Sequence, residues 1–166
     1  MKFIDKFKYC PSCGSCHFEE NDFKSKRCAE CGFTYFFNAA AAVVSIIANE
    51  RGELLVCRRA CEPAKGTLDL VGGFVDPSGE TLEEAMVREI KEETGLDIQT
   101  TQLKYLFSLP NTYLYSDLTV HTIDAFFYVE VDSSSVITPH DDVAECWWVS
   151  PDNLNPADIG LNSIRN

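Results

Sequence analysis

The sequence is poor in basic residues. Its 14 lysines and arginines stand against 26 aspartates and glutamates, which gives a formal net charge of −12 at pH 7. Proteins that bind nucleic acids or anionic membranes through nonspecific contacts need a basic surface. This balance argues against both kinds of partner, but it does not exclude an anionic small molecule held through metal ions.

Long apolar runs are missing as well. The first ten residues, MKFIDKFKYC, lack the continuous apolar segment of a signal peptide. No run approaches the roughly 20 apolar residues that span a bilayer. Internal repeats and low-complexity tracts are also lacking. We therefore expect a cytoplasmic protein without a membrane segment, consisting of one domain of ordinary size plus a small appendage.

Cysteine, by contrast, is abundant, and its spacing indicates a metal site rather than disulfides. Two C-x-x-C pairs, each followed by glycine, flank the fourteen residues 14–27. Such turns let four thiolates converge on one cation, as in zinc ribbons. The expected zinc ligands are Cys10, Cys13, Cys28 and Cys31. Cys16 and His17 lie between the pairs and can compete as ligands, and a redox motif or a disulfide is the weaker alternative.

This zinc ribbon is expected to cover residues 1–35. A segment so short has little core of its own, so zinc should supply much of its folding energy. We expect a structural role for it, because no basic and aromatic surface that would read nucleic acid is evident in the sequence.

The segment from Gly72 to Leu96 organises the rest of the chain. It begins with two glycines and a Pro-Ser-Gly turn, and it continues from Glu80 with residues that favour a helix. Gly95 stands where a left-handed helix stop is expected. Three glutamates fall at positions i, i+3 and i+4 and therefore share one face of this helix. They are Glu89, Glu92 and Glu93.

The three glutamates form a patch of like charge. Like charges four residues apart destabilise a helix by roughly 0.2–0.5 kcal/mol per pair, and by more where water is partly excluded. A divalent cation removes this conflict, and carboxylate oxygens are preferred ligands of Mg²⁺ and Mn²⁺. The alternative is a solvated acidic helix face. The glycines before and after the helix favour the metal site.

From Glu80 onward the segment resembles the signature of the Nudix hydrolases. That signature reads G, five residues, E, seven residues, then REUxEExGU, where U is a bulky aliphatic residue. The chain matches every specified position from Glu80 to Leu96, with Arg88 opening the second part. It departs once, because six residues rather than five separate Gly73 from Glu80. The additional residue lies in the turn at 76–79, where a change of length is most easily absorbed.

The resemblance implies an α/β/α sandwich with a mixed sheet over residues 36–166, a fold of the α/β (α+β) class that follows the zinc ribbon. The chain pattern agrees, because apolar and β-branched runs that read as strands surround one central helix. The expected strands cover residues 39–48, 53–59, 67–71, 98–109, 120–131 and 143–149. A turn at 49–52 joins the first two, and a short helix is expected after Ser150.

The resemblance also implies hydrolysis of a nucleoside diphosphate linked to another group, with Mg²⁺ or Mn²⁺ as cofactor. Phosphoryl transfer needs mainly charge neutralisation and alignment from the protein, which suits an acidic metal site. The implied metal ligands are Glu89, Glu92, Glu93 and the main-chain carbonyl of Gly73. Arg88 and Glu80 are expected to form a pair that orients the helix. Asp142 and Glu145 are candidates for a further catalytic acid, and Asp124 is a candidate for a buried acid.

Substrate contacts are expected from both sides of this helix. Arg58, Arg59 and Lys65 precede it and can face phosphates, with ordinary solvated charge as an equal alternative. The segment 108–115 follows it and is the expected specificity loop, in which Asn111 offers hydrogen bonds. The candidates for stacking on a base are Tyr113, Tyr115 and Phe107, with core aromatics as the alternative.

A zinc ribbon before the catalytic domain resembles the NADH pyrophosphatase group of the family. Those enzymes carry SQPWPFPxS downstream, and here Ser108, Pro110 and the aromatic Tyr113 match it, whereas the intervening residues do not. We therefore expect an ADP-X substrate, with ADP-ribose favoured over NADH or NAD. A catalytically silent domain that binds a nucleotide and regulates a partner is the second class, but the intact glutamates argue against it. Homodimers are common in the family, so a homodimer is a candidate assembly.

Overall fold

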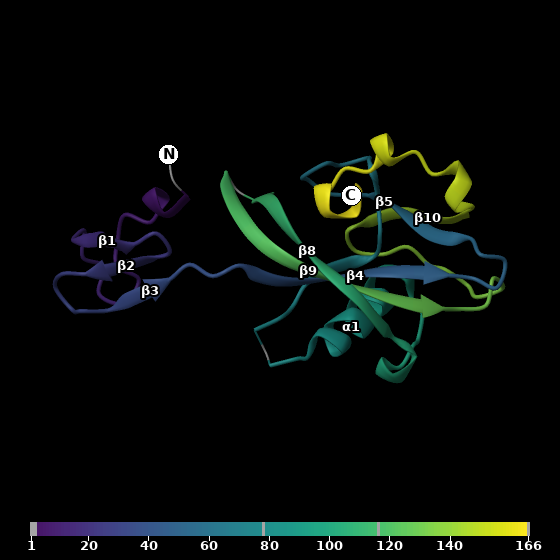
Figure 1. Cartoon of the computed structure of the whole chain (residues 1–166), viewed down its shortest axis with the longest axis horizontal. Coiled ribbons are helices and arrows are strands. Elements are labelled where there is room, and N and C mark those ends of the chain that lie inside the picture. Colours follow the sequence, from purple (N-terminus) through teal and green to yellow (C-terminus); the bar gives the residue numbers. More distant parts are fainter. Residues whose placement is uncertain (1–2, 78, 116, 166) are drawn as a thin grey trace.

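The computed structural model describes residues 3–77, 79–115 and 117–165, which form two β-sheets at different ends of the molecule (Figure 1). The smaller sheet is N-terminal and antiparallel, and it follows a short 3-10 helix, η1 (Phe3–Lys6). Its strands are β1 (Phe18–Asp22), β2 (Ser25–Cys28) and β3 (Thr34–Phe36). An extended segment carries the chain from β3 into the larger sheet.

The larger sheet is mixed, as expected from the sequence. Its described strands are β4 (Ala40–Ala48), β5 (Leu54–Arg59), β6 (Leu68–Asp69), β7 (Gly72–Phe74), β8 (Lys104–Tyr115), β9 (Leu118–Glu130) and β10 (Val143–Val149). β4 and β9 run parallel, whereas the other pairings among these strands are antiparallel. The order β10-β5-β4-β9-β8 leaves β8 and β10 at the two edges.

Helix α1 (Leu82–Thr94) begins and ends at the residues that its local sequence favours. Thr81 Oγ1 accepts a hydrogen bond from the Glu84 amide at 3.2 Å, and the Glu84 carboxylate accepts one from the Thr81 amide at 2.7 Å, which together form a capping box. Because Thr81 is the cap, the helix begins two residues after Glu80. Gly95 adopts a φ of 74° and ends the helix in the left-handed conformation, as predicted.

The larger sheet lies between two helical layers, which confirms the α/β/α architecture (Figure 1). On one face, Met86 and Ile90 of α1 pack with Val43 and Phe127 in the buried core. The C-terminal segment covers the opposite face. It contains η3 (Pro151–Asn153), η4 (Pro156–Asp158) and α2 (Asn162–Arg165). None of the described helices is long and apolar enough to cross a membrane.

β4 and β5 part soon after the predicted turn that joins them. The Gly52 amide closes this turn by donating to the Asn49 carbonyl at 2.9 Å. Within the described chain, the two strands then share one register pair, Ala48 with Leu54. Beyond it, β5 pairs with β6 and β4 pairs with β7, so these short strands hold the sheet open. Gly72 is required for this close pairing, because a Cβ there would overlap the carbonyl oxygen of Val43.

The N-terminal segment touches the larger sheet through aromatic rings. Phe3 in η1 lies edge-on to Phe37 and to His121 of β9, with ring centroids 5.1 and 5.8 Å apart. Phe7 also contacts Phe37, with centroids 4.7 Å apart. These contacts hold η1 beside the β8–β9 hairpin (Figure 1).

Two expectations about the region after α1 are wrong. The strand predicted at 98–109 begins only at Lys104, because residues 100–102 form a 3-10 turn. Residues 108–115, expected as a specificity loop, form the second part of β8 and pair with β9 along their whole length. Pro110 is tolerated within this strand because β8 lies at an edge of the sheet, where a missing amide breaks no ladder on the open side.

Candidate active site

A cavity of about 320 Å³ opens where β4 and β5 part. One end is formed by α1 and the β6–β7 segment, and the other end is formed by β8, β9 and the C-terminal segment. Asp141 and Asp142, just before β10, contribute to the wall. The cavity therefore brings together elements that are far apart in the sequence.

The glutamate face of α1 points into this cavity. Glu89 and Glu93 are buried, at 9% and 6% exposure, whereas Glu92 lies at the rim with 46% of its side chain exposed. The Gly72 amide donates a hydrogen bond to Glu93 Oε2 at 3.1 Å, which fixes that carboxylate against β7, called the glycine strand because it contains Gly72 and Gly73. All three glutamates that the helix register placed on one face line the same cavity.

Arg88 connects the acidic face to the residue that precedes the helix. Its guanidinium donates to the two oxygens of Glu80 at 2.8 and 3.1 Å. It also donates to Glu89 at 2.8 Å and to Glu92 at 3.0 Å, and to the Phe74 carbonyl at 3.0 Å. The hydrogen bonds to Glu80 are the largest cause that raises the pKa of Arg88. This planar, permanently charged group therefore holds α1 against β7 and compensates part of the negative charge.

Gly73 leaves room for the carboxylate of Glu89. A Cβ at this position would lie 2.6 Å from Glu89 Cδ and would overlap the carboxylate oxygens. The absence of a side chain thus lets the main chain of β7 and the Glu89 carboxylate occupy the same corner of the cavity. A main-chain oxygen beside carboxylate oxygens is the kind of donor set that hard cations prefer.

The cavity disfavours the negative charge of its own carboxylates. Burial raises the pKa of Glu93 to about 9, against the opposing effect of the Gly72 amide. The nearby charges of Glu89, Asp69 and Asp142 raise it further. Burial also raises the pKa of Glu89 above its ordinary value. A divalent cation among these oxygens would relieve both effects, and carboxylate oxygens are the donors that Mg²⁺ and Mn²⁺ prefer.

Arg59 and Asp69 form a buried ion pair in the cavity wall, with 12% and 8% of their side chains exposed. Arg59 Nε also donates to the Pro63 carbonyl at 2.8 Å. Burial raises the pKa of Asp69, and the pairing with Arg59 opposes that shift. Sequence reasoning proposed Arg59 but missed Asp69, for which the one available signal is an acid placed just before the paired glycines.

Arg58 and Glu145, both proposed from the sequence, lie outside the lining of the cavity. They pair with each other across β5 and β10, with 41% and 57% of their side chains exposed. Arg58 also covers the ring of Trp147, with 5.2 Å between the guanidinium carbon and the ring centroid. Lys65 is exposed and outside the lining too. Of the two acids proposed beyond the helix, Asp142 is therefore the one that reaches the cavity.

The end of the cavity away from α1 is polar and buried. Asn111 Nδ2 donates to Asp124 Oδ2 at 3.0 Å, and Thr122 Oγ1 donates to Asp124 Oδ1 at 2.6 Å. Ser163 of α2 donates to Asp124 Oδ2 at 2.7 Å. Sequence reasoning singled out Asn111 and Asp124, but not Thr122 or Ser163, because hydroxyls in a strand or near a terminus carry no distinct signal.

The aromatic candidates lie elsewhere. Tyr115 is 63% exposed at the end of β8 and does not line the cavity. Phe107 stacks on Phe126, with ring centroids 4.9 Å apart, and is also outside the lining. The side chain of Tyr113 lies outside the described part of the structure.

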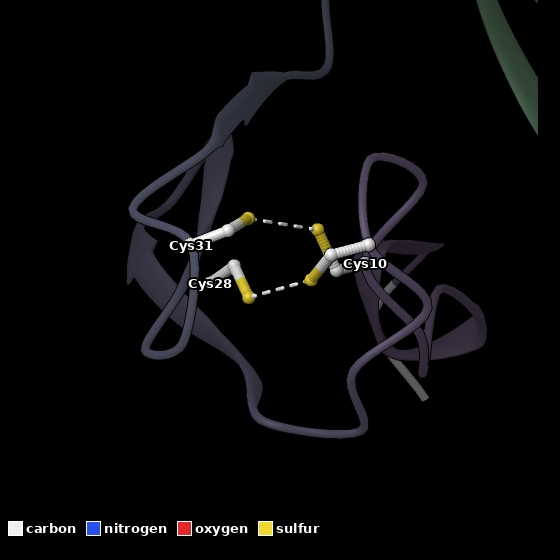
Figure 2. A group of neighbouring side chains, drawn as sticks. Cys10, Cys28 and Cys31 are labelled. Atoms are coloured by element: carbon white, nitrogen blue, oxygen red, sulfur yellow. Dashed lines mark hydrogen bonds between the residues drawn. The ribbon is translucent and has the colours of Figure 1, made fainter.

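The predicted thiol cluster forms a second site, in the smaller sheet. The Sγ atoms of its members all lie within 4.8 Å of one another. The distance from Cys10 to Cys31 is 3.7 Å and that from Cys13 to Cys28 is 3.6 Å. A tetrahedral zinc ion with Zn–S bonds of about 2.3 Å requires Sγ separations of about 3.8 Å, so the geometry fits zinc. Figure 2 shows the labelled sulfurs turned toward a common centre.

Two further observations concern the ligand set. The Cys31 amide is the largest cause that lowers the pKa of Cys28, to about 6, whereas hydrogen bonds from the neighbouring thiols raise the pKa of Cys13, so main-chain hydrogen bonds favour the thiolate at Cys28. Cys16 and His17 are exposed and do not belong to the cluster. His17 Nδ1 instead pairs with Glu30 at 2.9 Å.

Comparison with known proteins relates this architecture to a family. A model of the NUDIX domain matches residues 38–165. The chain is 36% identical over 122 residues to the ADP-ribose pyrophosphatase of Methanocaldococcus jannaschii, which covers 74% of this chain and 68% of that protein. It is 24% identical over 152 residues to the NAD-capped RNA hydrolase NudC of Stutzerimonas stutzeri, which covers 92% of this chain and 51% of that protein.

The NUDIX hydrolase from Nitrosomonas europaea has a similar fold, with a TM-score of 0.67 at 21% identity over 95% of this chain and 86% of that one. The chain spans about half the length of the NAD-capped RNA hydrolases that it matches. The family model covers most of the chain and includes the glycine strand, the glutamate helix and the cavity between them. The chain therefore belongs to the Nudix family.

Proposed function

We propose that the protein is a Mg²⁺- or Mn²⁺-dependent hydrolase that cleaves the diphosphate bond of a nucleoside diphosphate linked to X, with ADP-ribose preferred. One observation carries this proposal: Glu89, Glu92 and Glu93 line one cavity, and burial there makes the charge of Glu89 and Glu93 costly unless a cation is bound. The 36% identity to an ADP-ribose pyrophosphatase supports the substrate class. The cytoplasmic location expected from the sequence belongs to the same proposal.

The residues divide into ligands and positioning groups. Glu89, Glu92 and Glu93, with the main-chain carbonyl of Gly73, would hold the divalent cation. When bound, the cation neutralises phosphate charge and activates water for attack on phosphorus. Arg88 and Glu80 position the helix through their paired hydrogen bonds. Asp142, at the cavity wall, is the candidate for an additional acid.

Arg59 is the candidate for a phosphate contact, because it lines the cavity and carries the permanent charge that phosphate recognition uses. Its neighbour Arg58 has no place in this proposal, since its pairing with Glu145 lies on the surface. Asn111, which also lines the cavity, is the candidate for a hydrogen bond to the substrate.

Zinc in the thiol cluster has a structural role in this proposal. The buried residues around it are few, so the ion would supply much of the stability of residues 1–35. The proposed boundary between a ribbon at 1–35 and a hydrolase domain at 36–166 falls within the last strand of the smaller sheet, β3, just before the chain enters the larger one.

NADH or NAD hydrolysis is the second candidate, and one observation favours it. The match to the NAD-capped RNA hydrolase extends over 152 residues and therefore includes part of the N-terminal sheet. The match to the ADP-ribose pyrophosphatase, over 122 residues, is short enough to lie within the hydrolase domain. A relative that acts on capped RNA also keeps an RNA-linked dinucleotide within the range of substrates to be tested.

A substrate panel separates these candidates. We would compare kcat/KM for ADP-ribose, NADH, NAD, diadenosine polyphosphates, nucleoside triphosphates and an NAD-capped RNA in the presence of Mg²⁺. A preference for ADP-ribose supports the proposal. A preference of more than about tenfold for NADH or for the capped RNA would select the second candidate, and a preference for triphosphates would reject the ADP-X class.

A further inference from the structure

We infer that Asp124 and Asn111 form a sugar-hydroxyl site at the end of the cavity away from the glutamate helix. The ligand class is a ribose with vicinal hydroxyls, supplied either by the nucleoside or by the X group of the substrate. This inference rests on the proposed function for the identity of the whole substrate, but its test uses binding and does not require turnover.

Asp124 is a buried carboxylate without a cation. It is 4% exposed, and among the described residues no lysine, arginine or histidine pairs with it. Asp69, another buried acid of the same cavity, has Arg59 as its cationic partner. A buried carboxylate must be satisfied by hydrogen bonds, and here neutral side chains of the protein supply them.

Three neutral donors hold Asp124 in a fixed orientation. Asn111 and Ser163 donate to Oδ2, at 3.0 and 2.7 Å, and Thr122 donates to Oδ1 at 2.6 Å. An ionised carboxylate offers about four acceptor positions, two on each oxygen. Oδ2 is therefore saturated, whereas Oδ1 retains an acceptor position on a residue that lines the cavity.

The residues around Asp124 favour a hydrogen-bond donor from a ligand group that is not aromatic. Leu161 and Ile164 of the C-terminal segment and Ala42 and Val44 of β4 line the cavity near this end, and all are aliphatic. Among the described lining residues, the one aromatic side chain is Phe74, which lies two strands from Asp124, because Ala42 of β4 pairs with both residues. A ribose at Asp124 needs hydrogen bonds and aliphatic contact, and the residues beside this carboxylate provide both. Carboxylates bind ribose hydroxyls in this way at nucleotide sites.

A purely structural role is the competing explanation. Ser163 belongs to α2, so its hydrogen bond to Asp124 also ties the C-terminal segment to the sheet. If this tie were the whole purpose of Asp124, loss of the carboxylate would weaken all ligands equally. A hydroxyl site instead distinguishes ligands by their hydroxyl groups, and that difference is measurable.

The first test changes the ligand and leaves the protein intact. Calorimetry in Ca²⁺ would give dissociation constants for ADP-ribose and for two analogues, in which the 2- and 3-hydroxyls are removed from the adenosine ribose or from the distal ribose. We expect one analogue to bind about tenfold or more weakly, because hydrogen bonds to charged groups are the stronger ones. The analogue that loses affinity identifies the source of the sugar. Equal affinity of all three ligands would overturn the inference.

The second test changes the protein. Asp124→Asn keeps the shape but removes the charge, so the preference for ADP-ribose over the weak analogue should fall to a few-fold. Ser163→Ala removes the tie to α2 and keeps the carboxylate, so the preference should persist. A uniform loss of affinity for all three ligands in both variants would show that Asp124 only anchors the C-terminal segment, and would overturn the inference.

The two proposals fail separately. If ADP-ribose binds with the expected discrimination but is not hydrolysed in Mg²⁺, the hydroxyl site stands and the proposed hydrolase function fails. Hydrolysis without discrimination overturns the hydroxyl site alone. No binding of ADP-ribose to the intact protein overturns both.

Discussion

The protein has two groups of candidate metal ligands, the thiol cluster and the glutamates of α1, and the surroundings of the two groups differ. The thiol cluster lies beside a small sheet whose buried hydrophobic cluster consists of Cys10, Phe18 and Cys28, so two of its three members are themselves candidate ligands. The carboxylate cluster lies on a helix that packs through other residues on the large core of the second sheet. The fold around the thiol cluster therefore depends on the cluster itself, whereas the glutamates are positioned by a hydrophobic core that does not include them.

This difference has a direct consequence for metal removal. The small sheet should lose its structure together with its ion, because little else is buried there. The larger sheet should keep its structure and lose only its chemistry. Substitutions at the two groups of ligands test this contrast, and a substitution outside both serves as a reference.

The largest effect is expected from Cys28→Ser. Structural zinc contributes about 10–16 kcal/mol of binding free energy in small zinc domains, so loss of one ligand should unfold residues 3–36. Metal analysis should give less than about half an equivalent of zinc, and hydrogen exchange should lose protection in the small sheet but not in the larger one. Cys16→Ser is the matched control, because Cys16 lies outside the cluster. Full zinc content in Cys28→Ser would contradict the assignment.

Glu93→Gln should remove most of the catalytic activity without unfolding the protein. The amide keeps the shape but removes a metal ligand, so kcat/KM for ADP-ribose should fall by about a thousandfold. Burial raises the pKa of Glu93 to about 9, so without a cation this carboxylate must take up a proton on folding at neutral pH, which costs stability that a glutamine does not lose. Without added Mg²⁺, Tm should therefore stay equal or rise. A lower Tm with intact activity would contradict the assignment of Glu93 as a metal ligand.

Gly73→Ala should have a smaller effect on the same site. The new Cβ meets the Glu89 carboxylate, and the resulting displacement should cost about 1–3 kcal/mol. We expect kcat/KM to fall by about tenfold to a hundredfold, with weaker activation by Mg²⁺ in a titration. Unchanged Mg²⁺ dependence would show that the main chain at this position does not adjoin the cation.

Arg58→Gln should have the smallest effect. Exposed ion pairs contribute about 0–1 kcal/mol, and Arg58 and Glu145 lie outside the cavity lining. Activity should change by less than about twofold and Tm by little, and adding Glu145→Gln should change neither further. A large loss of kcat/KM in Arg58→Gln would place this surface pair in the substrate path.

Local signals predicted the parts of the site that lie close together in the sequence. The helix, its Gly95 stop and its shared glutamate face follow from spacing alone, and the structure has each of them. The C-x-x-C spacing likewise predicted four sulfurs that converge. In both cases the geometry of a single turn or helix determines which side chains meet.

The remaining parts depend on strand register, which the sequence does not display. Arg58 and Arg59 are neighbours in β5, and alternation sends one to the surface and the other into the cavity, but the sequence does not tell which. Asp124 meets Asn111 only because β8 pairs with β9, and Ser163 joins them from the end of the chain. Residues 108–115 became a strand because this pairing outweighs the turn preference of Pro110.

The central claim is that the glutamate face of α1 holds the cation for diphosphate hydrolysis. The most direct measurement is release of AMP from ADP-ribose by the zinc-containing protein as Mg²⁺ is titrated, for the parent, Glu92→Gln and Glu83→Gln. Glu83 lies in the first turn of α1, exposed and outside the cavity. We expect no turnover without Mg²⁺, saturable activation in the parent and Glu83→Gln, and strongly weakened activation in Glu92→Gln. Turnover that is independent of Mg²⁺, or equal in all three proteins, would contradict the claim.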